Sequence, residues 1–158
     1  MYTESDAAGL MLAMGIPQSI LGFKYIKDAL MILEDDPDAI HGVMVRVYAE
    51  VAGKRNTTTA RAEKAIRHAI GIAWQRGDPG LRLRIFGNSV KPGGKRPANS
   101  EFLAACSGYL ESQAARMESF AAAPAPLKEE FLRLWELYLE QKNAGQDHQE
   151  RHERRNNG

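Results

Sequence analysis

The sequence predicts an all-α fold: a compact domain of about six helices with a helix-turn-helix, followed by a C-terminal extension helix. Apolar residues recur at intervals of three and four along most of the chain, whereas almost no segment alternates as a strand does. Gly and Pro residues separate these helical patterns from one another. The 158 residues, 44% of them hydrophobic, suffice for one domain with a real core.

The first third of the chain should hold four helical segments. A short helix is expected at residues 5–14 and should end before Pro17, because proline has a fixed φ and no N–H. A second helix should end at the acidic stop of residues 34–37. A third should begin near Asp38 and break near Tyr48, before a short fourth helix.

The helix that follows carries the strongest pattern in the chain. Asn56 suits a left-handed C-terminal residue and Thr58 suits an N-cap, which leaves a tight turn between two helices. The second of these helices should end at Gly77. Its apolar side holds Ala62, Ile66, Ala69, Ile70, Ala73 and Trp74, and its opposite side holds Arg61, Lys64, Arg67 and His68. A helix, a short turn and a longer basic helix form the helix-turn-helix arrangement of DNA-binding proteins.

A short helix and a basic loop are expected next. The helix should run through residues 81–86, and the Gly/Pro-rich loop of residues 87–97 carries the three cations Lys91, Lys95 and Arg96. Such a loop either reaches a flanking phosphate, as a wing does, or is simply solvated. Asn99 or Ser100 should cap a further helix with an apolar face.

A lead-in helix is expected at residues 1–14 and the main domain at residues 15–111. Three further segments should follow the domain. Residues 112–126 should be a helix extension and an Ala/Pro linker, residues 127–143 an amphipathic helix, and residues 144–158 a charged, disordered tail. The apolar stripe of the amphipathic helix could pack on the same domain, form a dimer or dock a partner. His148 and His152 have the spacing of a metal pair, but a solvated tail is favoured over a metal site.

The charged residues are sorted along the chain, although its net charge is only +1. Residues 54–96 contain eleven basic and two acidic residues, a net charge of +9. Residues 1–53 and 97–158 carry net charges of −5 and −3. A basic block on a near-neutral chain indicates one surface that faces a polyanion.

Several functional classes find no support in the sequence. Cys106 is the only cysteine and lies in an apolar run, so we expect a buried, inert thiol and no disulfide framework. Inspection finds no nucleophile–base pair, metal-ligand set or phosphate-binding loop, so we expect no catalytic residues, no cofactor and no metal ion. Neither a signal peptide nor a membrane-spanning run is evident, and we expect a cytoplasmic, nucleoid-associated protein with no membrane partner.

Seven short segments together resemble a known family. They are Gly15-Ile16-Pro17, Gly22-Phe23-Lys24-Tyr25, Asn56-Thr57-Thr58, Glu63 to Ile70, Ala73-Trp74-Gln75-Arg76-Gly77, Phe86-Gly87 and Pro97 to Phe102. In order and spacing they resemble the C-terminal DNA-binding domain of the stage-zero sporulation response regulator. The resemblance covers about Gly15 to Leu110, 96 of the 158 residues.

The resemblance implies a six-helix domain whose helix-turn-helix enters the major groove, with subunits arranged head to tail on repeated short boxes. The family's base-reading pattern Arg-x-Glu-Arg corresponds here to Arg61, Glu63 and Lys64. Lys64 departs from that pattern, because lysine is a point charge that lacks arginine's planar fork. The candidates for contacts with the DNA backbone are Thr58, Arg67, His68, Lys91, Lys95 and Arg96. Arg67 and His68 could instead pack within the fold.

Family members carry an N-terminal receiver, whereas this chain begins only about 14 residues before the resemblance. We therefore expect a standalone effector without its own phosphoacceptor, which binds double-stranded DNA as a transcription regulator. A homodimer on tandem sites and a contact with RNA polymerase are further partner hypotheses. The alternative is a protein-interaction module that modulates another regulator or RNA polymerase without specific DNA binding.

Overall fold

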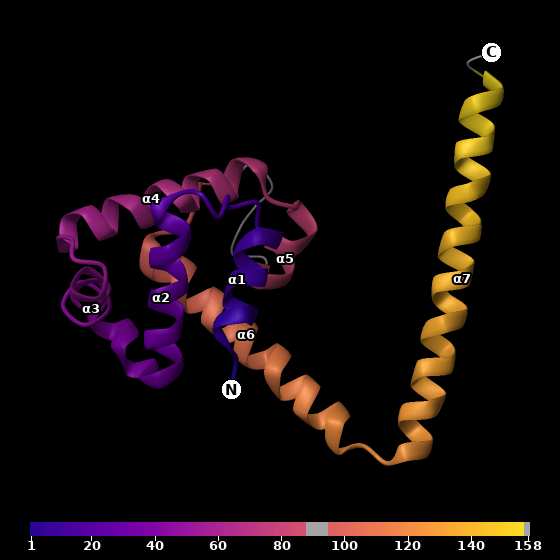
Figure 1. The fold of residues 1–158 in the computed structure, drawn as a ribbon, viewed down its shortest axis with the longest axis horizontal. Helices are drawn as coiled ribbons and strands as arrows, with labels where there is room; N and C mark the ends of the chain where they lie inside the picture. The colour runs from indigo at the N-terminus through magenta and orange to yellow at the C-terminus, as the bar shows by residue number, and fades with distance from the viewer. Residues whose placement is uncertain (88–94, 157–158) are drawn as a thin grey trace. The chain divides into compact units, whose positions relative to one another are not determined.

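A computed structural model describes residues 1–87 and 95–156, with side chains described up to residue 143. Every regular element in these ranges is helical, which confirms the predicted all-α class (Figure 1). The chain forms two compact units, residues 1–115 and residues 116–158. No helix within the described ranges is long and apolar enough to span a bilayer.

Within the described residues, the first unit contains seven helical elements, the last of which continues into the second unit. They are α1 (Glu4–Ala13), α2 (Leu21–Asp35), the 3₁₀ helix η1 (Pro37–Gly42), α3 (Val47–Lys54), α4 (Thr59–Arg76), α5 (Pro79–Phe86) and α6 (Asn99–Ala122). Helix α2 contacts α1, η1, α3 and α4 (Figure 1). The core draws on several of these helices, since Met11, Ile26, Ile66 and Phe102 are all fully buried.

A glycine sets the close crossing of α2 over α4. A Cβ atom on Gly22 would lie only 2.3 Å from the carbonyl oxygen of Ala65 and 2.6 Å from the Cβ of Ala69. Real Cβ atoms are essentially never found so close to backbone oxygen. The absence of a side chain at Gly22 therefore allows the basic helix to lie directly against the centre of the unit.

The third helical segment begins near Asp38 as predicted, but it is a short 3₁₀ helix and does not continue to Tyr48. Residues 37–42 form the 3₁₀ helix η1, turns follow, and the next α-helix begins only at Val47. The sequence offers a reason, because Gly42 and the β-branched residues Val43 and Val45 all disfavour an α-helix. The Arg46 guanidinium closes the segment by an ion pair with Asp36.

The predicted caps of α6 are also wrong, because Asn99 and Ser100 are already helical. The Glu101 carboxylate accepts a 2.8 Å hydrogen bond from the backbone N–H of Ala98, just before the helix. The Asn99 amide instead donates to the Glu63 carbonyl of α4, at 3.3 Å. The residue expected to cap α6 therefore joins it to the basic helix.

The second unit contains the end of α6 and the helix α7 (Ala125–Asn156). Helix α7 extends well beyond residue 143, where the sequence pattern predicted the start of a disordered tail. The Phe120 and Phe131 rings, one from each helix, meet edge to face with centroids 5.0 Å apart. Large hydrophobic side chains between residues 127 and 139 remain 38–58% exposed.

Candidate DNA-recognition surface

A short turn joins α3 to the basic helix α4. Asn56 adopts the predicted left-handed conformation, with φ of 49°. The Thr58 hydroxyl accepts a hydrogen bond from the backbone N–H of Arg61 at 3.3 Å, which confirms Thr58 as the N-cap. Helix α4 then ends at Arg76, directly before Gly77, as predicted. The local geometry is that of a helix-turn-helix.

A partly buried ion pair, which the sequence pattern did not predict, joins α2 to the start of this turn. The Arg55 guanidinium donates from Nε to Asp28 Oδ2 at 2.5 Å and from its terminal nitrogen to Oδ1 at 2.8 Å. The Asp28 side chain, on α2, is only 11% exposed, and that of Arg55 is 37% exposed. The hydrogen bond to Asp28 raises the pKa of Arg55. An acidic residue inside the apolar stripe of residues 20–33 was the available signal.

Helix α4 separates its residue types as the 100° spacing predicts. Ala62, Ile66, Ala69, Ile70 and Ala73 are buried, whereas Arg61, Lys64, Arg67 and His68 are exposed. Trp74, expected on the buried side, is only partly buried and lies edge to face on Phe86, with centroids 5.3 Å apart. The Arg82 guanidinium lies 5.4 Å from the Trp74 ring centroid.

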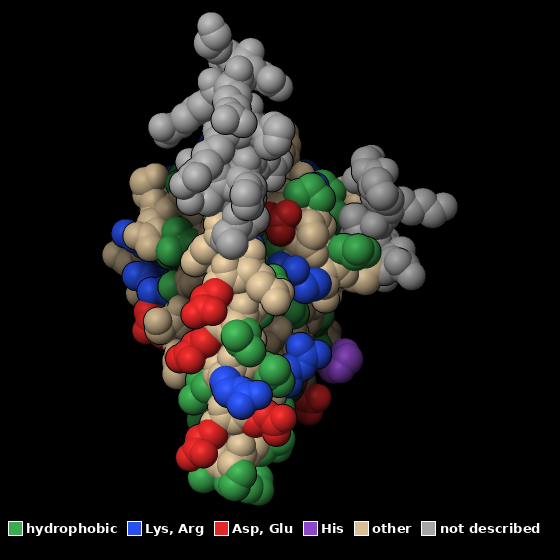
Figure 2. Space-filling model, turned by 90° about the vertical axis from the view of Figure 1, so that its right-hand side faces the viewer, with side chains coloured by type: hydrophobic (Ala, Val, Ile, Leu, Met, Phe, Trp, Pro, Cys, Tyr) green, Lys and Arg blue, Asp and Glu red, His purple; other side chains and the backbone are tan. Residues whose placement is uncertain are grey.

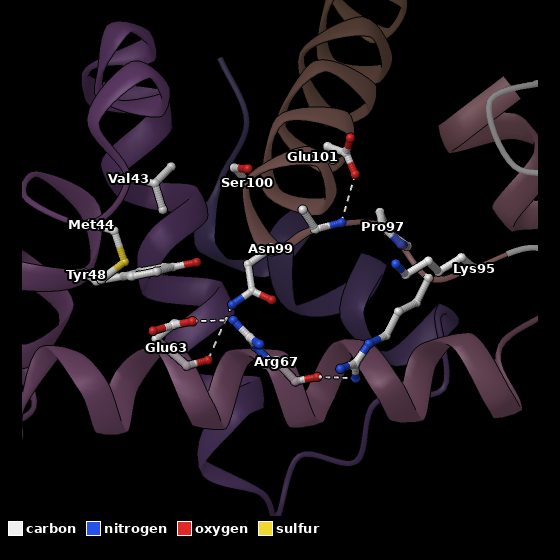
Figure 3. A pocket seen from close by; sticks show the side chains of 12 residues that line it. Val43, Met44, Tyr48, Glu63, Arg67, Lys95, Pro97, Asn99, Ser100 and Glu101 are labelled. Carbon is white, nitrogen blue, oxygen red and sulfur yellow. Dashed lines mark hydrogen bonds and ion pairs between the residues drawn. The ribbon is translucent and has the colours of Figure 1, made fainter.

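Glu63 and Arg67 form an ion pair on one flank of α4 (Figure 3). The Glu63 side chain is 28% exposed and that of Arg67 is 56% exposed. Burial raises the pKa of the nearby Tyr48 phenol, while a hydrogen bond with Asn99 partly opposes that rise. Of the three residues expected to read bases, Glu63 is thus held by a protein partner, and Arg61 and Lys64 lie on the exposed face.

An open groove of about 540 Å³ runs beside this flank. Tyr48 and the Glu63–Arg67 pair line one part of it, and residues 95–101 line another (Figure 3). The groove thus brings the start of α6 next to the basic helix. It contains both signs of charge, since Lys95, Arg96 and Glu101 also border it.

The segment before α6 adds cations beside α4. Lys95 and Arg96 are both exposed, and an Arg96 guanidinium nitrogen donates to the Arg67 carbonyl at 3.4 Å. The same nitrogen would lie 3.2 Å from a Cβ atom on Gly71. Arg96 therefore lies along the surface of α4. Lys91, the third cation of the predicted loop, lies outside the described residues.

The cysteine thiol and the possible metal ligands bear on other kinds of chemistry within the described residues. The Cys106 thiol is completely buried, and burial raises its pKa far above the ordinary range. Across residues 1–87 and 95–143, no group of three His, Cys, Asp or Glu side chains is placed to bind a metal ion.

A comparison with protein families agrees with this geometry. The family model described as sporulation initiation factor Spo0A C terminal matches residues 8–110. The chain belongs to this Spo0A C-terminal family. The match runs from α1 through the first half of α6, and therefore includes the turn and all of α4. Membership in the Spo0A C-terminal family supports a DNA-binding domain of the effector type.

Proposed function

We propose that this protein is a sequence-specific transcription regulator that inserts α4 into the major groove of double-stranded DNA. The observation that carries the proposal is the exposure of Arg61 and Lys64 at the start of a helix that a tight turn presents. The first residues of a recognition helix are those that reach base edges. The buried opposite side and the Gly22 crossing hold that helix against the core.

The three base-reading candidates have different chemistry. Arg61 can grip the O6 and N7 atoms of guanine through its planar fork, whereas Lys64 offers a single ammonium. A carboxylate such as that of Glu63 can accept from cytosine N4. We assign Arg67 the role of holding the Glu63 carboxylate, because the two form an ion pair along one helix flank. Arg67 then contributes to base preference through Glu63.

The remaining candidates are assigned to the DNA backbone. Thr58, at the N-terminus of α4, and His68, Lys95 and Arg96, on or beside its exposed side, can meet phosphates that flank the groove. Lys91 stays a candidate from the sequence alone. We further propose that two copies bind tandem sites, and that the protein is found at the nucleoid, where such sites are.

Contact with RNA polymerase is a second candidate function. Met44 and Val45 are 51% and 80% exposed, just before α3, and Met44 also lines the groove. Exposed apolar residues beside a DNA-binding helix would suit a protein that binds next to the regulator on a promoter. This role could accompany DNA binding or, as an interaction module, replace it.

A mobility-shift titration tests the main proposal. The full chain is titrated with duplexes that contain a sporulation-type box or a scrambled sequence, at several salt concentrations. Specific binding should exceed scrambled binding at each salt concentration, and affinity should fall as salt rises. Equal weak binding to both duplexes with no salt dependence would refute DNA recognition and leave the interaction module as the function.

Two variants test the assigned roles. Arg61→Ala should weaken binding to the preferred box selectively, by about 1–3 kcal/mol, because a bidentate base contact is lost. Lys95→Ala should weaken binding to both duplexes about equally and reduce the salt dependence. The opposite pattern would reverse these assignments.

A further inference from the structure

Helix α7 carries a row of exposed hydrophobic side chains outside the region that matches the family model. Eight large ones are 38–58% exposed, namely Leu127, Phe131, Leu132, Leu134, Trp135, Leu137, Tyr138 and Leu139. We call these residues the α7 stripe. Hydrophobic side chains are visible among charged ones on the face shown in Figure 2. The described residues of the second unit leave these side chains half uncovered.

Four residues of the α7 stripe have the spacing of a helix-pairing seam. Leu127, Phe131, Leu134 and Tyr138 follow one another at intervals of four, three and four residues, as the core positions of a heptad repeat do. Trp135 widens the row on one side. Its ring stacks with Phe131 at 6.5 Å between centroids and with Tyr138 at 5.5 Å. These contacts order the surface before any partner binds, which lowers the entropic cost of binding.

The α7 stripe is large enough for a specific interface. The three aromatic side chains bury about 150–250 Å² each when fully covered, so at half exposure they offer on the order of 225–375 Å² per copy. The five half-exposed leucines add roughly 150–300 Å². Two copies together would bury on the order of 1,000 Å², which is about the least that a specific interface needs. The largest apolar patch on a soluble monomer is typically about 300–600 Å². The stripe is therefore as large as the largest apolar patches on monomers, and such patches are often functional.

We propose that the α7 stripe binds the same stripe of a second copy of this chain. A heptad-spaced row is complementary to itself, because each large residue enters the space between those of an identical helix. Charge does not oppose the pairing, since residues 125–143 carry three basic and four acidic side chains. This pairing does not depend on the proposed DNA binding, and its test uses no DNA.

Sedimentation analysis of the full chain tests the pairing. The wild type should have twice the 17.5 kDa mass of one chain. Phe131→Glu combined with Leu134→Glu places two charges in the seam and should weaken the dimer by at least about 100-fold. Arg133→Glu is the matched control, because it changes the net charge by the same amount. Arg133 lies on the opposite side of α7 by the 100° spacing, so this variant should stay dimeric.

Cysteine crosslinking is a second test that does not depend on disrupting the helix. Leu134 lies near the middle of the α7 stripe, so Leu134→Cys should form an intermolecular disulfide whether the helices run parallel or antiparallel. Leu127→Cys should crosslink to itself only in a parallel pair. The native Cys106 does not compete, because it is completely buried. The Arg133→Cys variant, on the other side of the helix, should not crosslink.

Three results would overturn the pairing. One is a monomeric wild type at high micromolar concentration, which would mean that the stripe binds its own chain or a different protein. Another is a dimer that survives the double substitution with α7 still helical by circular dichroism, because another surface would then form the dimer. The third is equal crosslinking of Leu134→Cys and Arg133→Cys. If the double variant loses helicity, the crosslinking result decides.

Discussion

Arg55→Ala should destabilise the first unit and the turn before α4 more than any exposed charge substitution nearby. The change removes two hydrogen bonds, of 2.5 and 2.8 Å, and leaves the Asp28 carboxylate without its cation at 11% exposure. Breaking a fully buried pair costs about 3–5 kcal/mol. The Arg55 side chain is 37% exposed, so water screens the charge, and we expect about 1–3 kcal/mol.

Urea denaturation measures this loss. With a slope of about 1–3 kcal/mol per molar urea, a loss of about 2 kcal/mol lowers the midpoint by roughly 1 M. Asp28→Asn and the double variant complete a thermodynamic cycle, in which the coupling energy between the two side chains should be about 1–3 kcal/mol. The same variants should also weaken binding to a preferred DNA box, because the start of α4 would be less well ordered.

Lys54→Ala is the matched control on the same helix. Lys54 lies 4.0 Å from Glu50 in an exposed ion pair, and such pairs contribute about 0.3–0.5 kcal/mol. If Arg55→Ala costs no more than Lys54→Ala, the pair with Asp28 does not hold the turn. A coupling energy near zero in the cycle would refute the reasoning in the same way.

Three further predictions concern the stability of the first unit. Gly22→Ala should lower the free energy of unfolding by about 1–3 kcal/mol, because its Cβ atom would overpack against α4. Gly9 lies in open space on α1, so Gly9→Ala should raise the free energy of unfolding by up to about 1 kcal/mol in the same urea denaturation assay. Thr3→Ala should lower the free energy of unfolding by about 1 kcal/mol, because it removes the N-cap of α1. Hydrogen bonds from Thr3 lower the pKa of Asp6, so this stabilisation is present above pH 3.8 and is lost as pH falls through the lowered pKa. Burial raises the pKa of Tyr2 from 10.0 to about 12, so wild-type stability should fall between those pH values. Tyr2→Phe should reduce that fall, and Tyr48, whose pKa burial also raises, should account for part of the remainder. An unchanged pH profile for either of the last two variants would contradict the assigned groups.

The sequence predicted best where local chemistry and hydrophobic spacing agreed. Asn56, Thr58 and Gly77 mark the bounds of the turn and of α4 through backbone conformation and capping, and these are properties of single residues. The apolar side of α4 followed from the 100° spacing, because one face of the helix meets the core. Trp74 was the exception at the edge of that face.

The sequence predicted less where distant residues decide the outcome. The pairs Asp28–Arg55 and Asn99–Glu63 join residues 27 and 36 positions apart. Asp28 stands out as an acidic residue within an apolar stripe, but no local pattern indicates its partner or the partner of Asn99. The Asn99 amide was expected to cap its own helix, yet in the folded chain it donates to α4. The apolar spacing of residues 37–46 alone suggested an α-helix. Their glycine and β-branched residues disfavour one, and the segment forms a short 3₁₀ helix followed by turns.

The two proposals address a single physical problem. In the proposed complex with DNA, Lys64 presents a point charge where an arginine guanidinium would make two aligned hydrogen bonds. One good bidentate contact is worth about 1–3 kcal/mol of base discrimination. A single domain would therefore distinguish its box less sharply. Pairing through the α7 stripe would join two copies of α4, and linked modules can gain about 10²–10⁴-fold in overall affinity without any new contact to DNA. The extension outside the family match would then recover, through paired sites, the discrimination that one recognition helix lacks.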